Sequence, residues 1–279
     1  MFERDAGVTV IHRKRSSNMI NFNEKKGFIC DMDGVIYHGN RILPGVKEFI
    51  QWMQEENKEY LFLTNSSGYT RKELQQKLAR MGLDVSEEHF YTSALATAEF
   101  LKKQAPGCSA YVIGEAGLYN ALYEAGITMS DYDPDYVVIG EAKSYSLDTL
   151  TKATNLVVNG AKLIGANSDV TTPLENGIAP ACQALVAPVE MATGKKAYYC
   201  GKPNPLMVRT GLKLLGCHSA EAVFVGDRMD TDIVAGTECG VDTVLVLSGV
   251  STRETLKTYA YQPTVVMDGV GDIVKEAKK

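Results

Sequence analysis

Four aspartates and a lysine are placed where this chain is expected to do chemistry. Asp31 and Asp33 follow one short apolar run, Lys202 follows another, and Asp227 follows a third, with Asp232 one helical turn further on. At about 4 Å and an effective dielectric of about 20, each pair of like charges would cost about 4 kcal/mol. Such a cluster requires cations, and a single lysine is not enough. Oxygen ligands without His or Cys favour Mg²⁺ over Zn²⁺.

The spacing of the first two aspartates indicates phosphoryl chemistry. In extended geometry, residues two apart point the same way, so Asp31 and Asp33 would act on the same bond. One carboxylate can attack phosphorus while the other gives a proton to the leaving oxygen and later takes one from water. Gly34 lets the backbone turn away and leaves amides facing phosphate oxygens. Thr64 and Asn65 supply further donors to the same oxygens.

Each feature has a common alternative when it is taken alone. An isolated Asp-x-Asp-Gly is more often a turn or a calcium loop, and an acid such as Asp232 more often begins a helix. Lys202 alone would be a solvated surface lysine, whereas in a phosphate site it neutralises charge on the transferring group. Because every member follows a predicted strand and the set is chemically complete, we predict Mg²⁺-dependent hydrolysis of small phosphate monoesters through a phospho-aspartate on one of the first two aspartates.

The elements that must position these residues alternate between strand and helix. In open α/β sheets, ligands bind beyond the carboxyl ends of the strands. Thr70 and Glu73 form a predicted capping box that begins a helix between two of the strands, which indicates a βαβ unit and a parallel sheet. Predicted strands cover 27–30, 60–63, 111–114, 136–140, 162–165, 197–200, 222–225 and 243–247. The fold class is therefore α/β, with a Rossmann-like parallel sheet.

The middle of the chain reads as a compact α/β unit inserted into an outer one. We predict a core domain over 22–91 and 195–279 and an inserted domain over 92–194. Two strands of the insert end in Val-Ile-Gly-Glu, at 112–115 and 138–141, an echo too short to indicate a repeat. Residues 1–21 are expected to form a disordered extension without a function.

Composition excludes several classes of protein. Apolar residues make up 45% of the 279 and charged residues 23%, so a folded core is expected. A net charge of −5 gives no basic surface for a nucleic acid polymer. No apolar run approaches the roughly 18–20 residues of a membrane span, and the basic run 12–15 is not followed by the apolar stretch of a secretory signal. None of the six cysteines stands in C-x-x-C spacing, so we expect reduced thiols and a cytoplasmic location.

At these residues the chain resembles the haloacid dehalogenase (HAD) superfamily. Residues 31–35, Asp-Met-Asp-Gly-Val, are similar to the nucleophile loop of the superfamily. Thr64-Asn65, with Ser66 beside it, is similar to the second motif of the superfamily. The third motif is similar to 201–203, Gly-Lys-Pro, and the fourth to the specific stretch 226–233, Gly-Asp-Arg-Met-Asp-Thr-Asp-Ile. The insert resembles a type-C2a cap, and 91–94 and 247–250 are similar to NagD-like phosphatases.

The resemblance implies a role for each matched residue. Asp31 would be the nucleophile and Asp33 the general acid and base. Mg²⁺ would be held by Asp31, the Asp33 carbonyl and Asp227, with Asp232 in support. The substrate would be a nucleoside monophosphate, a sugar phosphate or another small phosphorylated metabolite, and a homodimer through the cap is a family-level expectation.

The cap loop that follows the predicted strand 162–165 is the remaining candidate. Asn167 and Asp169 would meet the leaving group if the loop closes over the core; otherwise the segment is a solvated turn. Two other functions stay open at this point: a sugar phosphomutase or phosphotransferase that uses the same aspartyl chemistry, and a phosphate-binding regulator without activity.

Overall fold

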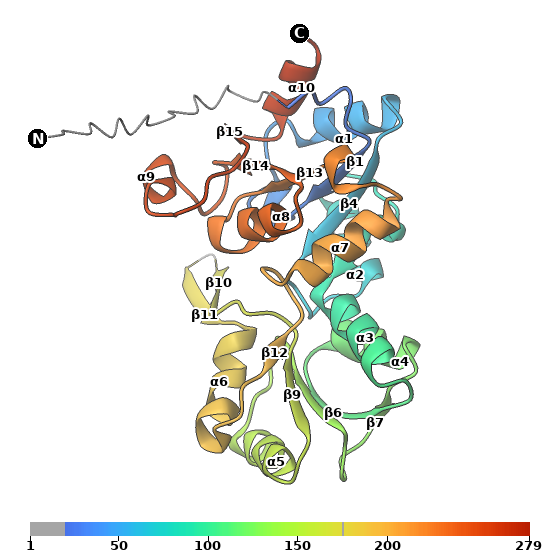
Figure 1. Ribbon diagram of the computed structural model, residues 1–279, viewed down its shortest axis with the longest axis vertical. Helices are drawn as coiled ribbons and strands as arrows, with labels where there is room; N and C mark the ends of the chain where they lie inside the picture. The colour runs from blue at the N-terminus through green and yellow to red at the C-terminus, as the bar shows by residue number, and fades with distance from the viewer. Residues whose placement is uncertain (1–19, 175) are drawn as a thin grey trace, which may run out of the picture.

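The computed structural model describes residues 20–174 and 176–279 and shows two stacked α/β units, a core and a cap (Figure 1). Both ends of the described chain lie in the core, and the middle of the chain forms the cap, so the predicted insertion is observed. Most of the predicted extension over 1–21 lies outside the described residues. Ile20, however, is only 6% exposed and packs in the core, so the folded part begins before residue 22.

A parallel sheet forms the centre of the core. Gly27 pairs with Ala222 on one side and with Glu59 on the other, so these three neighbouring parallel strands are in register and their carboxyl ends lie at the same edge of the sheet. In spatial order the strands are β15 (Val265–Met267), β14 (Asp242–Val246), β13 (Ala222–Gly226), β1 (Gly27–Cys30), β4 (Glu59–Thr64) and β5 (Phe90–Thr92).

The core strands are buried on both faces, which explains their continuous apolar sequences. In β1, Phe28 and Cys30 face one hydrophobic cluster, whereas Ile29 faces the other. The first cluster includes α1 (Val46–Glu55), α2 (Arg71–Arg80) and α10 (Gly271–Ala277). The second includes α7 (Pro205–Leu214) and α8 (Val234–Glu238) and continues through α3 (Ser93–Gln104) into the cap. The core is therefore a three-layer sandwich.

Local sequence chemistry sets the loops that frame the sheet. The predicted capping box is present, because the Thr70 side chain accepts from the Glu73 amide and the Glu73 side chain accepts from the Thr70 amide. A short hairpin of β2 (Tyr37–His38) and β3 (Arg41–Ile42) follows the nucleophile loop. A short helix, α9 (Arg253–Leu256), follows β14.

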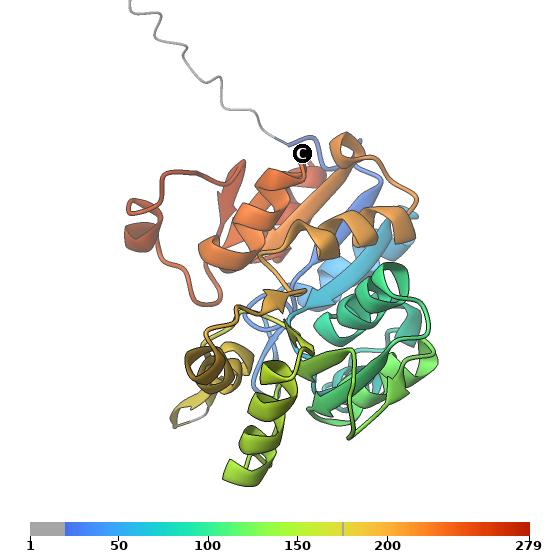
Figure 2. The same ribbon diagram turned by 60° about the horizontal axis from the view of Figure 1, so that its bottom comes forward.

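The cap contains a second parallel sheet with helices on both faces. Figure 2 shows α3 and α4 in green on one side and α5 and α6 in lime and gold on the other. In spatial order its strands are β12 (Tyr198–Tyr199), β9 (Lys162–Gly165), β8 (Tyr136–Ile139), β6 (Ser109–Ile113) and β7 (Thr128–Met129). The other cap elements are α4 (Ala116–Glu124), α5 (Leu147–Val158), α6 (Cys182–Thr193) and a hairpin of β10 (Thr171–Leu174) and β11 (Gly177–Pro180).

The second domain boundary differs from the prediction. Residues 195–200 were expected in the core, but β12 pairs with β9, with Tyr198 opposite Ile164, so the cap continues beyond residue 194. An apolar run predicts a strand without indicating which sheet it joins. The last cap strand therefore leads directly to Lys202.

No helix in the described part of the chain is long and apolar enough to cross a bilayer.

Candidate active site

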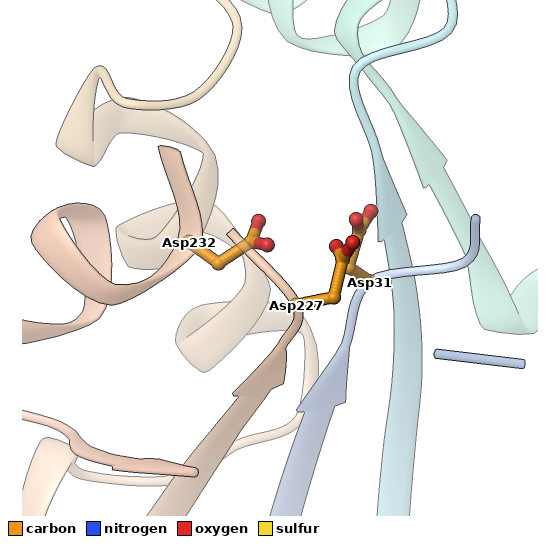
Figure 3. Close-up of side chains that lie close together, drawn as sticks. All are labelled: Asp31, Asp227 and Asp232. Carbon is orange, nitrogen blue, oxygen red and sulfur yellow. The ribbon is translucent and has the colours of Figure 1, made fainter. Parts of the chain in front are cut away.

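The carboxylates of Asp31, Asp227 and Asp232 converge at the carboxyl edge of the core sheet (Figure 3). Asp31 follows β1 and Asp227 follows β13, and these strands pair in register, with Cys30 opposite Val225. Asp232 comes from a π-helical turn, Met229–Ile233. One oxygen from each carboxylate lies within 4.8 Å of the others, and the three residues are 8%, 1% and 0% exposed. Two neighbouring parallel strands and the turn after one of them therefore bring together three of the four predicted aspartates.

Lys202 enters this cluster from the cap side. Its Nζ donates to Asp31 Oδ1 at 2.6 Å, to Asp232 Oδ1 at 2.7 Å and to the Leu63 carbonyl at 3.2 Å, and the side chain is 2% exposed. Burial opposes the charge on Lys202, but Asp232 and Asp31 outweigh it and hold its pKa above the usual range. Lys202 is therefore a buried cation shared by two carboxylates.

Asp227 has unused acceptor capacity. Its Oδ2 accepts from the Val250 amide at 2.7 Å, whereas its buried Oδ1 has no partner among the described residues. Burial, with Asp232 and Asp31 nearby, raises the pKa of Asp227. Burial also raises the pKa of Asp232, with Lys202 acting in the opposite direction. A buried carboxylate oxygen without a partner, within a cluster of oxygen ligands, fits a divalent cation.

Two glycines close tightly around Asp227. A Cβ atom on Gly34, whose φ is +81°, would lie 2.5 Å from Asp227 Oδ2, and one on Gly249 would lie 2.0 Å from the same atom. The Ser248 hydroxyl donates to the Gly34 carbonyl at 2.7 Å and joins the two loops. Gly34 is required here both for its left-handed backbone and for its lack of a side chain.

Asp33 is placed differently from the expectation. Its side chain is 54% exposed, against 11% for Asp31, and lies 3.6 Å from His38 Nδ1. The assumed extended geometry ends early, because the Met32 carbonyl accepts from the amides of Ile36 and Tyr37 and the chain turns. The Asp33 carboxylate therefore lies outside the buried acidic cluster. The metal contact predicted for its carbonyl stays a prediction.

Asn65 is predicted to present a donor to phosphate, but in the structure its side chain holds Lys202 instead. Its Oδ1 accepts from the Lys202 amide at 2.7 Å, and its Nδ2 donates to the Lys202 carbonyl at 3.0 Å and to Asp169 at 3.1 Å. Thr64 Oγ1 accepts from the Ser66 amide at 3.1 Å, which fixes that hydroxyl at the end of β4.

The predicted cap loop is present, but its two predicted binding residues, Asn167 and Asp169, differ in whether they can face a substrate. Asn167 is fully buried, with its Nδ2 donating to Asn65 O at 2.6 Å and its Oδ1 accepting from the Asp169 amide, so it is not placed to meet a leaving group. Asp169 is half-buried, and its surroundings raise its pKa by desolvation, with Arg228 acting in the opposite direction. Of the two, Asp169 is the one that can face a substrate.

A group of residues that the sequence patterns do not indicate joins the two units. Glu141 follows β8 in the cap and accepts from Asn167 Nδ2 at 2.7 Å and from the Ser67 amide at 2.8 Å. Ser93 donates its hydroxyl to the Asn65 carbonyl at 2.5 Å. The sequence signal that could have indicated Glu141 is the Gly-Glu pair at 140–141, which follows a predicted parallel strand at the edge of the sheet where functional residues gather.

Comparison with known proteins identifies the family. The family described as haloacid dehalogenase-like hydrolase matches residues 28–128, and the HAD-hydrolase-like family matches 199–273. The dihydroxyacetone phosphatase of Corynebacterium glutamicum (strain R) is 44% identical over 88% of this chain and 90% of its own length. The ribonucleotide monophosphatase NagD of Escherichia coli K12 is 42% identical, covering 89% of this chain and 98% of its own. The structure of NagD superimposes with a TM-score of 0.85 over the same coverage.

The chain belongs to the haloacid dehalogenase superfamily. It is a NagD-like phosphatase that hydrolyses phosphate monoesters. A 4-nitrophenylphosphatase structure from Thermotoga maritima is also similar, with 32% identity and a TM-score of 0.89 over 93% of this chain and 100% of its own. The predicted superfamily and fold are confirmed.

Proposed function

We propose that this NagD-like phosphatase hydrolyses small phosphorylated metabolites with Mg²⁺ held by Asp31, the Asp33 carbonyl and Asp227, with Asp232 in support, through a phospho-aspartate on Asp31. The observation that carries the proposal is the buried carboxylate cluster, with Lys202 fixed against the nucleophile and an Asp227 oxygen that has no partner in the described part of the chain. Relatives named for dihydroxyacetone, ribonucleotides and acid sugars support a small monoester as the substrate.

Each residue has a distinct role in the proposed reaction. Lys202 Nζ holds Asp31 Oδ1, which leaves the second carboxylate oxygen of Asp31 to attack phosphorus. As the bond from phosphorus to the leaving oxygen breaks, the Asp33 carboxyl gives that oxygen its proton. Bound Mg²⁺ would offset the negative charge of the phosphate oxygens.

The second half of the reaction regenerates Asp31. The Asp33 carboxylate takes a proton from water, the water oxygen attacks phosphorus, and the bond between phosphorus and Asp31 breaks to release inorganic phosphate. The exposure of Asp33 is consistent with this role, because its carboxyl must reach first a leaving group and then solvent water.

Two measurements test the proposal. Phosphate release should be measured over a panel of nucleoside monophosphates, sugar phosphates and triose phosphates, with Mg²⁺ and with EDTA. Borohydride added during turnover should reduce the acyl phosphate, and mass spectrometry should find the reduced side chain at residue 31. Activity that persists in EDTA would refute the metal, and a modification absent from Asp31 would refute the nucleophile.

A further inference from the structure

The Glu141 carboxylate joins the cap to the core away from the acidic cluster. Its Oε2 accepts from the Ser67 amide at 2.8 Å and from the Ser67 hydroxyl, and its Oε1 accepts from Asn167 Nδ2 at 2.7 Å. Ser67 follows the core strand β4, whereas Asn167 follows the cap strand β9. Ser67 and Asn167 are both fully buried. One side chain therefore ties the ends of a core strand and two cap strands together.

The backbones of the two units touch at the same place. A Cβ atom on Gly140 would lie 2.5 Å from Ser67 Oγ, and one on Gly117 would lie 2.5 Å from the Tyr69 carbonyl oxygen. The Gly117 amide donates to the Gly68 carbonyl at 3.0 Å. The core loop 67–69 thus lies directly against the cap, in a seam that leaves no room for a side chain at these glycines.

A chain of hydrogen bonds leads from this seam to the nucleophile. Asn167 Nδ2 also donates to the Asn65 carbonyl at 2.6 Å, and the Asn65 side chain holds both the amide and the carbonyl of Lys202. Lys202 follows the cap strand β12, and the preceding amide of Gly201 donates to the cap carbonyl of Ala166 at 2.8 Å. The lysine that touches Asp31 is therefore carried by the cap, and its position depends on how the cap sits on the core.

We propose that Glu141 is a positioning residue that seats the cap on the loop after β4 and so fixes Lys202 against the nucleophile. The proposal rests on the proposed phosphatase function, because it concerns the alignment of that site. A carboxylate offers only acceptors, and here it meets two N–H donors that face it from different units. A Gln side chain has the same shape but must turn its own donor toward one of them.

The chain supplies a matched control in Glu115. It follows the neighbouring cap strand β6 in the same Val-Ile-Gly-Glu sequence. Its Oε1 accepts from the Lys143 amide at 2.6 Å, within the cap, and no hydrogen bond from its side chain to the core occurs among the described residues. Comparing Glu141→Gln with Glu115→Gln therefore separates seating of the cap from the general effect of removing a cap carboxylate.

The test compares the full-length wild type, Glu141→Gln, Glu141→Ala and Glu115→Gln with Mg²⁺ present. kcat and KM are measured for 4-nitrophenyl phosphate and for the best monoester of the panel. Amide hydrogen exchange is followed over residues 65–69, and Mg²⁺ affinity is measured by calorimetry. Loss of a hydrogen bond to a charged group predicts a fall in kcat of about tenfold or more in both Glu141 variants, for both substrates. Exchange over 65–69 should accelerate by a similar factor, while Mg²⁺ affinity stays unchanged and Glu115→Gln behaves like the wild type.

Several results would overturn the proposal. Wild-type kcat and wild-type exchange rates in Glu141→Gln would refute the positioning role. An effect confined to KM for the larger substrate would also refute it. The same would follow if kcat fell equally in Glu115→Gln. If Glu141→Ala fails to fold, the isosteric Glu141→Gln decides. If the wild type releases phosphate from no monoester, the proposed function fails, and the exchange rates still decide whether Glu141 seats the cap.

Discussion

Replacing Lys202 by Met should destabilise the phosphatase strongly. Lys202 Nζ lies 2.6 Å from Asp31 Oδ1 and 2.7 Å from Asp232 Oδ1, so each pair is worth about 6 kcal/mol of Coulomb energy at an effective dielectric of about 20, before desolvation. Met has similar length but no charge, and it would leave the fully buried Asp232 facing Asp31 without a cation.

The expected loss is about 3–5 kcal/mol in the free energy of unfolding, the usual cost of leaving one partner of a buried ion pair alone. Equilibrium urea denaturation in EDTA measures it. Repeating the titration with Mg²⁺ should return part of the stability, because a cation bound by the native state replaces part of the missing charge.

A double-mutant cycle isolates the cause. Asp232→Asn added to Lys202→Met removes the uncompensated charge, so the double variant should be more stable than Lys202→Met alone. A loss below about 1 kcal/mol for Lys202→Met, or additive effects in the cycle, would refute the view that Lys202 neutralises this cluster.

Three further predictions concern the chemistry. Asp31→Asn should reduce phosphate release from an aryl phosphate more than about a hundredfold, or roughly 3 kcal/mol in barrier, with an unchanged circular dichroism spectrum; a smaller loss would exclude Asp31 as nucleophile. Activity should vanish in EDTA and return with Mg²⁺. Asp227→Ala should raise the Mg²⁺ concentration needed for half activity about tenfold or more; an unchanged concentration would count against Asp227 as a metal ligand. Asp169→Ala should lower kcat/KM about tenfold for a bulky monoester and much less for a small aryl phosphate; equal losses would assign Asp169 to structure or chemistry instead of selection.

The type of chemistry was readable from residues that lie close to strand ends in the sequence. Asp31 and Asp227 each follow a short apolar run directly, and neighbouring parallel strands necessarily place such residues at one edge of a sheet. For the same reason the α/β fold, the inserted cap and the acidic cluster could be predicted. These features depend on local periodicity and on a general rule of sheet geometry, not on which distant segments touch.

Only the tertiary structure shows which partners the other site residues have and whether they belong to the core or to the cap. The run before Lys202 predicts a strand equally well for either sheet, and only its pairing with β9 places the lysine on the cap. Asn65 and Asn167 carry amides that could bind a substrate, yet both are buried and form hydrogen bonds with other segments of the chain instead. Glu115 and Glu141 share one sequence context, but among the described residues only the Glu141 side chain forms hydrogen bonds to the core. Hydrogen-bond partners more than twenty residues apart leave no periodic pattern in a sequence, because they are fixed by the packing of whole elements rather than by their neighbours along the chain.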